Sequence, residues 1–402
     1  MTQAFRTRDF ALKLRTFQWI VVEDIICREL YKKTTVLAVT GLNRFGGNEM
    51  KYLWSTIFSL FLLATCALIS ADCFAQSTRA QSAASYVERA NNSFLKGDID
   101  RAIDDYSIAI AFDGSSSAAY FNRGIAREKA GNIEDALRDF NKALEINPQF
   151  VPALMCRGLL RLDQNLIDEA LSDLNKAVRH APRDARVWAN RAVANLRLAR
   201  LDDAIRDCNE AIKLDKNSPV PWSNRCAAKF VKQQLTDALS DCDMALKLDP
   251  RNSETLNNRG SVLTELGYLD RALADLNRAI SIDTKKSHFF TNRGKIYLAL
   301  HNTDAALQDL DQAIIMKPSH PDAFITRGIA RAVKNDMLGG LSDLKRAIEL
   351  DPDSIEAWHN NGVVLLAAGK LDEAQAAFKR VTDLGGTVKP SALAMLEAAR
   401  KK

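Results

Sequence analysis

Apolar residues recur at helical spacing along most of the chain, in paired blocks that a short break separates. In one such pair, Tyr120 to Ala130 forms the first block, Gly131 and Asn132 make the break, and Ile133 to Ile146 forms the second block. Apolar residues at intervals of three and four predict amphipathic helices, and Gly or Asn just after a helix favours a left-handed turn. The pattern therefore predicts a helix, a tight turn and a second helix.

The paired pattern recurs nine times between residues 83 and 388, at a spacing of 34 residues without insertion or deletion. Positions within a repeat are counted from its first residue, so that Ser117 is position 1 of the second repeat. Position 4 is large, positions 8, 20 and 27 are small, and Pro is frequent at position 32. Small residues let two helix axes approach closely, and Pro ends the second helix because it lacks an amide hydrogen. Such regularity is typical of a stacked repeat array.

These columns resemble the tetratricopeptide repeat, and the resemblance covers about three quarters of the chain. It implies an all-α fold, a right-handed superhelical solenoid of helix-turn-helix repeats. The first helices of such a solenoid line a concave groove that binds proteins or peptides. The chain departs from the family pattern at position 7, where Arg replaces the usual aliphatic residue.

Position 7 is linked in the sequence to position 23. Arg occupies position 7 and Asp occupies position 23 in the first eight repeats, and the ninth repeat loses both, having Asn361 and Ala377. The joint loss predicts that the two side chains are partners, since a guanidinium and a carboxylate can share two hydrogen bonds. An anion-binding ladder of arginines is the alternative. The predicted structural ion pairs include Arg259 with Asp275 and Arg293 with Asp309.

Position 6 carries Asn in six of the repeats. The resemblance implies that position 6 faces the groove, together with apolar residues at positions 5 and 9 such as Phe121, Ile125 and Met155. An Asn side chain has both a donor and an acceptor, so a ladder of them can hold the backbone of an extended peptide. The alternative is that each Asn bonds to a neighbouring helix. The predicted ladder residues are Asn122, Asn190, Asn224, Asn258, Asn292 and Asn360.

Two segments precede the repeats. Residues 1–49 carry no repeat pattern, and we interpret them as a non-structural extension or as an artefact of a start site assigned too early. Residues 50–75 have a basic residue near their start, an apolar run at 52–71 and the small residue Ala75 at their end, which is typical of a secretory signal peptide. Cleavage after Ala75 would release the chain into the periplasm. If the run at 52–71 is not cleaved, it would instead anchor the chain in a membrane.

The repeats are flanked by short segments with distinct roles. Residues 76–82 are polar and form the expected linker, and residues 389–402 contain an apolar-periodic stretch expected to form a C-terminal capping helix. A solenoid needs such a cap because its last repeat otherwise exposes an apolar face. The chain has 55 Lys or Arg and 50 Asp or Glu, with both signs mixed, so its charge does not indicate a nucleic-acid partner.

The chain offers little for catalysis. Its five His residues lie at unrelated positions of the repeats, without metal-ligand spacing or a paired nucleophile. We therefore expect no catalytic residue, no bound metal and no cofactor. In an oxidising compartment Cys226 could form a disulfide with Cys242 or with Cys208, both at position 24, whereas free thiols are the alternative.

Together these features predict a non-enzymatic scaffold that binds a protein or an extended peptide in its concave groove, exported to the periplasm of a bacterial cell envelope. A structural spacer that self-associates into a homo-oligomer is one alternative. A regulatory subunit of an envelope enzyme is another.

Overall fold

The computed structural model describes residues 47–401, apart from some side chains near the start of the first helix, and the regular elements in this range are all helical. The predicted extension at 1–49 therefore lies almost entirely outside the described residues. The helices are α2 (Gly47–Leu95), α3 (Ile99–Phe112), α4 (Ser117–Lys129), α5 (Ile133–Ile146), α6 (Val151–Asp163), α7 (Ile167–His180), α8 (Ala185–Arg197), α9 (Leu201–Leu214), α10 (Pro219–Val231), α11 (Leu235–Leu248), α12 (Ser253–Glu265), α13 (Leu269–Ile282), α14 (Ser287–Ala299), α15 (Thr303–Met316), α16 (Pro321–Val333), α17 (Met337–Leu350), α18 (Ile355–Ala367), α19 (Leu371–Asp383) and α20 (Pro390–Arg400).

The chain divides into two compact units. One comprises α2 up to Tyr86 together with Ala111–Asp113, and the other comprises Val87–Ile110 together with the chain from Gly114 onward. In the first unit the rings of Tyr86 and Phe112 stack, with their centroids 5.7 Å apart. The second unit contains the stacked helix pairs.

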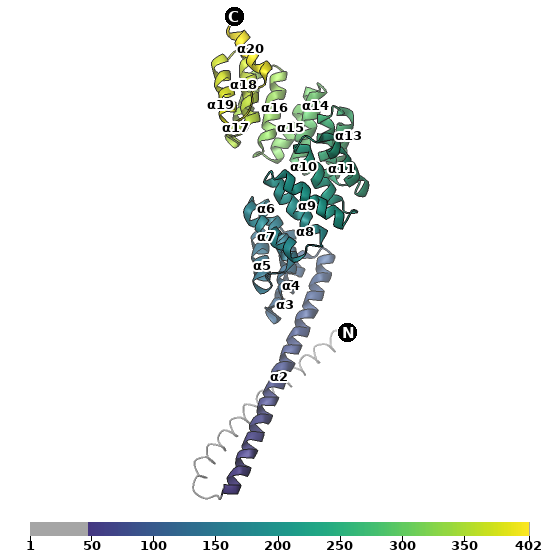
Figure 1. Cartoon of the computed structure of the whole chain (residues 1–402), viewed down its shortest axis with the longest axis vertical. Coiled ribbons are helices and arrows are strands. Elements are labelled where there is room, and N and C mark those ends of the chain that lie inside the picture. The colour runs from purple at the N-terminus through teal and green to yellow at the C-terminus, as the bar shows by residue number, and fades with distance from the viewer. Residues whose placement is uncertain (1–46, 402) are drawn as a thin grey trace. The chain divides into compact units, whose positions relative to one another are not determined.

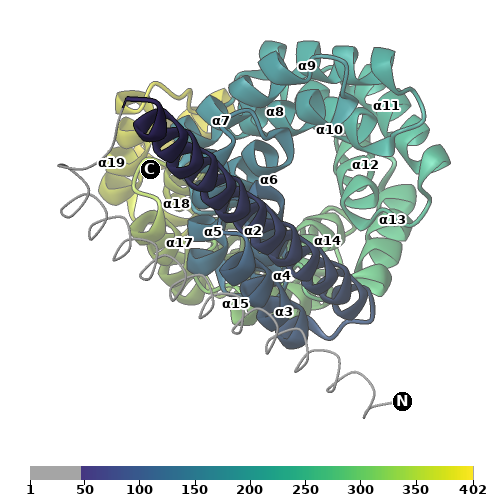
Figure 2. The same cartoon turned by 90° about the horizontal axis from the view of Figure 1, so that it is seen from below.

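Consecutive helix pairs of the second unit stack into a right-handed superhelical solenoid, which confirms the predicted fold class (Figure 1). The first helices of neighbouring repeats, such as α8, α10, α12 and α14, contact one another, whereas the second helices make no comparable contact within the described range. Figure 2 accordingly shows α8, α10 and α12 inside α9, α11 and α13. The first helices therefore line the inner face of the solenoid.

The turn between the two helices has the same backbone conformation in every repeat. Position 15 lies in the left-handed region throughout, with φ of 84° at Gly131, 54° at Ala199 and 61° at Gln233. The amide of Asn132 donates to the carbonyl oxygen of Arg127 at 2.8 Å, which satisfies one of the last carbonyls of the first helix. Ala and Gln do not favour a left-handed backbone. The packing of the helix pair therefore imposes this turn even where the residue type opposes it.

The two helices of a repeat touch where the small residue at position 8 meets the large residue at position 24. A Cβ atom added to Gly124 would lie 2.6 Å from Cε1 of Phe140, and one added to Gly158 would lie 3.0 Å from Cγ of Leu174. Such distances leave no room for a side chain in a close-packed interior. The glycines therefore set how closely the helices of a pair approach.

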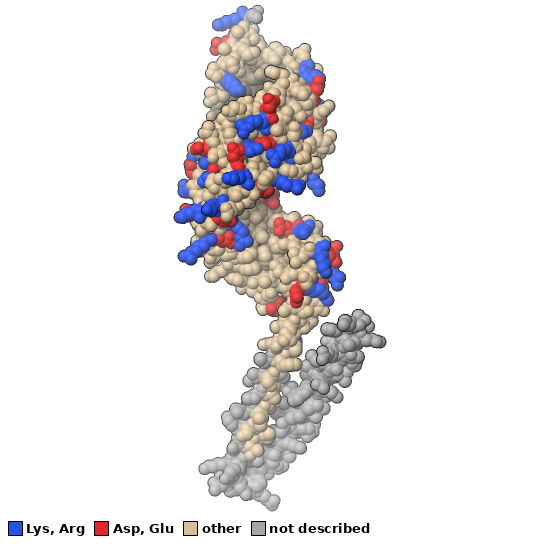
Figure 3. All heavy atoms as spheres, turned by 90° about the vertical axis from the view of Figure 1, so that its right-hand side faces the viewer, with Lys and Arg blue, Asp and Glu red and all other residues tan. Residues whose placement is uncertain are grey.

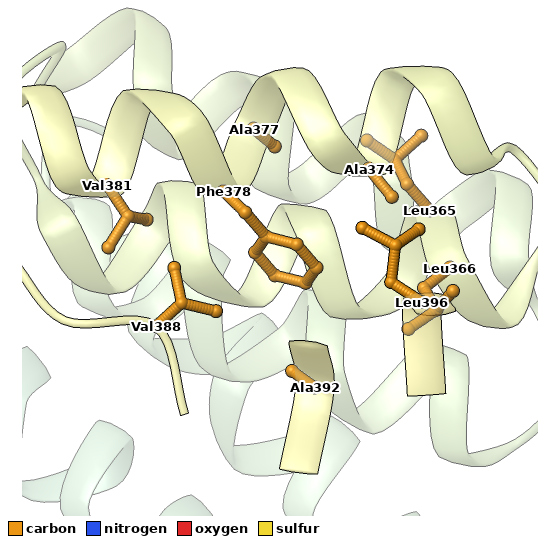
Figure 4. Close-up of a cluster of buried hydrophobic side chains, with 9 residues drawn as sticks. All are labelled: Leu365, Leu366, Ala374, Ala377, Phe378, Val381, Val388, Ala392 and Leu396. Atoms are coloured by element: carbon orange, nitrogen blue, oxygen red, sulfur yellow. The ribbon is translucent and has the colours of Figure 1, made fainter. Parts of the chain in front are cut away.

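The helix α20 covers the end of the last repeat. Val388, Ala392 and Leu396 pack on a cluster of buried side chains from α18 and α19 that includes Phe378 and Val381 (Figure 4). The observed helix, Pro390–Arg400, lies within the segment predicted to cap the array. It buries apolar surface that a further repeat would otherwise cover.

The segment at 76–82 is helical, although we expected a linker between a signal segment and the repeats. It is part of α2, which continues without a break into the first repeat. Ala, Gln and Arg have high helix propensity, and the segment has no Gly or Pro to stop a helix. Along the stretches that the structure describes, no helix is both long and apolar enough to cross a membrane. Several side chains of the run at 52–71 lie outside that description.

We predict that Gly124→Val lowers the free energy of unfolding by about 1–3 kcal/mol, because the added methyl groups collide with the ring of Phe140. Urea unfolding followed by circular dichroism measures the loss. Gly114→Ala is the matched control, since a Cβ there would meet only one backbone oxygen, at 3.7 Å. Equal midpoints for both variants would contradict the role given to position 8.

Candidate functional site

The predicted Asn ladder lies on the first helices, which line the inner face. Each of its six side chains is half-buried. Asn224 Nδ2 donates to the carbonyl oxygen of Ala189 at 3.4 Å, and Asn292 Nδ2 donates to Asn257 Oδ1 at 2.8 Å. Both bonds cross to the preceding repeat. Two of the six amides thus already bond to a neighbouring helix.

The side-chain amides of the other four ladder residues are not bonded to a neighbouring helix among the described contacts. Among the hydrogen bonds of the described residues, none involves the side chain of Asn122, Asn190, Asn258 or Asn360. A half-buried amide without a protein partner stays bonded to water, which a peptide backbone can replace. The local bonding that the sequence offered as an alternative is therefore seen at Asn224 and Asn292.

The apolar residues predicted for the groove are committed partly to the core. The ring centroid of Phe121 lies 5.7 Å from that of Phe140 and 5.3 Å from that of Phe150. Met155 and Ile125 likewise pack on buried clusters of their repeats. Each keeps some exposed surface, so this stretch of the inner face offers a shallow apolar surface.

A polar hollow lies farther along the inner face, between α10, α12 and α14. Its volume is about 150 Å³. Glu265 and Lys295 bring opposite charges to it, the ladder residue Asn292 lies on its wall, and the ring of Phe230 closes one side. Ser261, Thr264 and Ile296 complete the lining. The hollow has room for one or two polar groups of a bound chain.

Arg at position 7 and Asp at position 23 meet in each of the first eight repeats. The Arg Nε donates to one carboxylate oxygen at 2.7–2.9 Å in all eight, and Nη2 donates to the other oxygen. The pairs include Arg259–Asp275 and Arg293–Asp309, whose Asp side chains are nearly buried. The hydrogen bond to Asp275 raises the pKa of Arg259, so the ion pair stabilises the charged form of this guanidinium.

A third member of this group, at position 25 of the preceding repeat, was not among the residues predicted from the sequence. Arg157 Nη1 donates to Asn141 at 2.7 Å, and Arg259 Nη1 donates to Asp243 at 2.8 Å. The same contact recurs wherever a preceding repeat supplies an acceptor. The sequence does contain a signal for this contact between repeats. Lys345, which cannot accept a hydrogen bond from Arg, stands at position 25 just before the repeat that loses its Arg. The other acceptors are Ser107, Asn175, Asn209, Asn277 and Asp311.

A donor at position 11 supports the carboxylate in several repeats. Arg127 Nη1 donates to Asp139 and Asn195 Nδ2 donates to Asp207, at 2.7 and 2.9 Å. Leu263 occupies this position in the sixth repeat. Among the described contacts, Arg259 is the only side chain there that donates to Asp275. A substitution in this repeat therefore tests the pair without a second donor to the carboxylate.

Family models of the tetratricopeptide repeat match the chain in several segments and together cover more than half of it. The matched residues are 117–150, 157–219, 253–286, 291–355 and 344–376. The chain belongs to the tetratricopeptide repeat family. Proteins of this family generally act as non-catalytic interaction scaffolds.

Solved structures of tetratricopeptide repeat proteins have the same fold. A tetratricopeptide repeat protein from Parabacteroides merdae is 18% identical with a TM-score of 0.53, over 62% of this chain and 99% of that one. The APC/C hetero-tetramer Cut9-Hcn1 is 17% identical with a TM-score of 0.58, over 74% of this chain and 59% of that one. At these identities the likeness concerns the fold alone. No curated protein matches the chain.

Two histidines of this tetratricopeptide repeat protein lie beside carboxylates. His288 Nε2 lies 3.1 Å from Glu254 Oε2, and His320 Nε2 lies 3.9 Å from Asp322 Oδ2. Burial lowers the pKa of His320 and of His359. Within the part of the chain that the structure describes, His, Cys, Asp and Glu side chains do not gather into a group that could hold a metal ion.

The cysteines differ in state. Cys226 on α10 and Cys242 on α11 form a disulfide within the fifth repeat, and both are fully buried. Cys156 and Cys208 are free thiols. Burial raises the pKa of Cys156 to about 11 and that of Cys208 to about 12. Both thiols therefore stay protonated and unreactive at neutral pH.

We predict that Arg259→Leu lowers the free energy of unfolding by about 3–5 kcal/mol, because it leaves the buried Asp275 carboxylate without its partner. The double variant Arg259→Leu/Asp275→Leu should lose less than this single variant. Denaturant unfolding of both single variants and the double variant gives the coupling energy. The exposed pair Arg206–Asp203 serves as the control, with an expected coupling of about 0–1 kcal/mol. A coupling near zero for the buried pair would overturn its structural role.

Proposed function

We propose that this tetratricopeptide repeat protein is a non-enzymatic scaffold of the cell envelope, and that it binds an extended segment of a partner protein along its inner face. The observation that carries the proposal is the Asn ladder. Its residues recur on the first helices, half-buried, and four of their amides make no side-chain hydrogen bond among the described contacts. Such amides can donate to and accept from a peptide backbone at regular intervals.

The expected recognition is tolerant of the partner's sequence. Backbone bonds do not read side chains, and the apolar residues beside the ladder are largely engaged in the core. Affinity would then come from many modest contacts on a surface that is already formed, which limits the entropy cost of binding. The polar hollow beside Asn292 is a place where a side chain of the partner could be selected.

The partner proposed is a protein. Figure 3 shows Lys and Arg interspersed with Asp and Glu over the face it displays. Nucleic-acid binding requires a basic stripe or patch that tracks phosphates. The mixed charges do not make such a stripe on that face.

The envelope location is supported by two independent features. The segment 50–75 has, in order, a basic residue near its start, an apolar run and a small residue at its end, as signal peptides do. The disulfide between Cys226 and Cys242 is of the kind that persists in oxidising compartments such as the periplasm.

We predict that Asn122→Ala/Asn190→Ala/Asn258→Ala lowers the retention of unstructured peptides by the purified chain on the order of tenfold, because three backbone-bonding amides are lost. An immobilised library of mixed-sequence peptides is the probe. Far-UV circular dichroism should not change. Gln308→Ala/Gln312→Ala on α15, a second helix, removes exposed amides as a control. Unchanged retention, or an equal loss in the control, would refute the ladder.

We predict that the chain isolated from fractionated cells begins at Gln76, since Ala75 offers the small residue that signal peptidase needs. Intact-mass measurement of the envelope fraction identifies the first residue. Ala75→Arg should block this cleavage and leave the longer chain with the membranes. A full-length chain in the cytosolic fraction would contradict export.

A further inference from the structure

The helix contact of the fifth repeat differs from those of the repeats around it. In the sixth and seventh repeats a glycine at position 8 faces a leucine at position 24, as with Gly294 and Leu310. The fifth repeat has Cys226 and Cys242 at these two positions, joined by the disulfide. The two bonded cysteines have as many side-chain heavy atoms as one leucine beside a glycine. The disulfide-bonded pair therefore fills the space between the two helices that the leucine fills in the sixth and seventh repeats.

Two separate thiols do not fit this space equally well. The Cα atoms of Cys226 and Cys242 are 5.4 Å apart and both side chains are fully buried. Unbonded sulfur atoms must stay about twice as far apart as bonded ones. A reduced pair therefore has to push α10 and α11 apart, or turn a sulfur into side chains that already fill the interior.

The contacts of the pair extend to the next repeat and to the inner face. Cys242 Sγ lies 4.0 Å from the carbonyl oxygen of Thr255 on α12, and the Thr255 hydroxyl donates to Ser223 Oγ on α10 at 2.8 Å. Phe230 packs against the cluster that contains both cysteines, and the same ring closes one side of the polar hollow. A shift of α10 against α11 therefore changes the wall of that hollow.

We propose that the Cys226–Cys242 disulfide is a redox-dependent clamp that fixes the α10–α12 segment, and with it the polar hollow of the inner face. The thiols of Cys226 and Cys242 lose two protons and two electrons in all to the disulfide of an oxidising dithiol protein, which becomes two thiols. A dithiol reductant reverses the step and releases the clamp. Its effect on ligand binding rests on the proposed function, whereas its effect on the helices does not.

Cys208 does not compete for this bond. It occupies position 24 of the preceding repeat and is fully buried as a thiol. The disulfide joins Cys226 to Cys242 and leaves Cys208 as a free thiol. The clamp is thus confined to one repeat.

Amide hydrogen exchange of the purified full-length chain, with and without a dithiol reductant, tests the clamp without any ligand. Reduction should speed exchange in α10–α12 by about tenfold or more and leave α16–α19 unchanged. Cys226→Gly/Cys242→Leu is the matched control, because it installs the residue pair of the sixth and seventh repeats and should be insensitive to the reductant. Cys208→Ala should respond to reduction as the wild type does.

The outcomes are separable. No change in α10–α12, the same change in the Gly/Leu control, an equal change along all repeats, or free thiols at Cys226 and Cys242 in the protein isolated from the envelope would each overturn the clamp. Peptide retention measured on the same samples addresses the proposed function separately. If the oxidised chain keeps its exchange protection but does not retain peptides, the result supports the clamp and contradicts the proposed role of the groove in peptide binding.

Discussion

The close approach of the two helices within each repeat is the constraint on which the rest of the structure depends. In most repeats a glycine at position 8 lies against a large residue at position 24, as Gly124 against Phe140. Once that distance is fixed, the side chains at positions 7 and 23 face each other at hydrogen-bonding distance, and the turn at position 15 has one conformation to adopt. Gln233 accepts a left-handed backbone for this reason. The inner face inherits its regularity from the same contact, because every first helix is held at the same depth.

The Arg at position 7 adds a second link, between repeats. Its Nε and Nη2 atoms bond the Asp of its own repeat, while Nη1 bonds position 25 of the repeat before, as Arg157 does with Asp173 and Asn141. One guanidinium therefore bonds within its repeat and across to the preceding repeat, and both sets of bonds form only when the helix pair and the stack are correctly aligned. Burying a carboxylate is costly unless its partners are well placed. A misaligned stack would leave Nη1 of the Arg without its acceptor at position 25, so these contacts favour the observed stacking of one repeat on the next.

The sequence was sufficient for what depends on period and composition, and insufficient for what depends on spacing between repeats. The joint loss at Asn361 and Ala377 indicated that positions 7 and 23 act together, and the structure brings those two columns into contact. The acceptor at position 25 was not predicted, because its one signal, Lys345, stands in the repeat before the one that loses its Arg and shows only when two repeats are compared. The split of the Asn ladder could not be foreseen either. Whether Asn292 bonds to Asn257 depends on a distance across two helices, which the identity of each residue does not fix.

The place of the disulfide in the array gives it an effect that the same bond elsewhere would lack. Stability in a solenoid is carried mainly by contacts between nearest neighbours. A weak contact in an end repeat only frays that end, whereas one in the fifth of nine repeats separates the array into two shorter ones, each with a new exposed face. The polar hollow is built from helices of the fifth, sixth and seventh repeats, directly beside that point. A covalent bond at Cys226 and Cys242 therefore keeps the two halves, and the stretch of inner face that spans them, as one continuous surface.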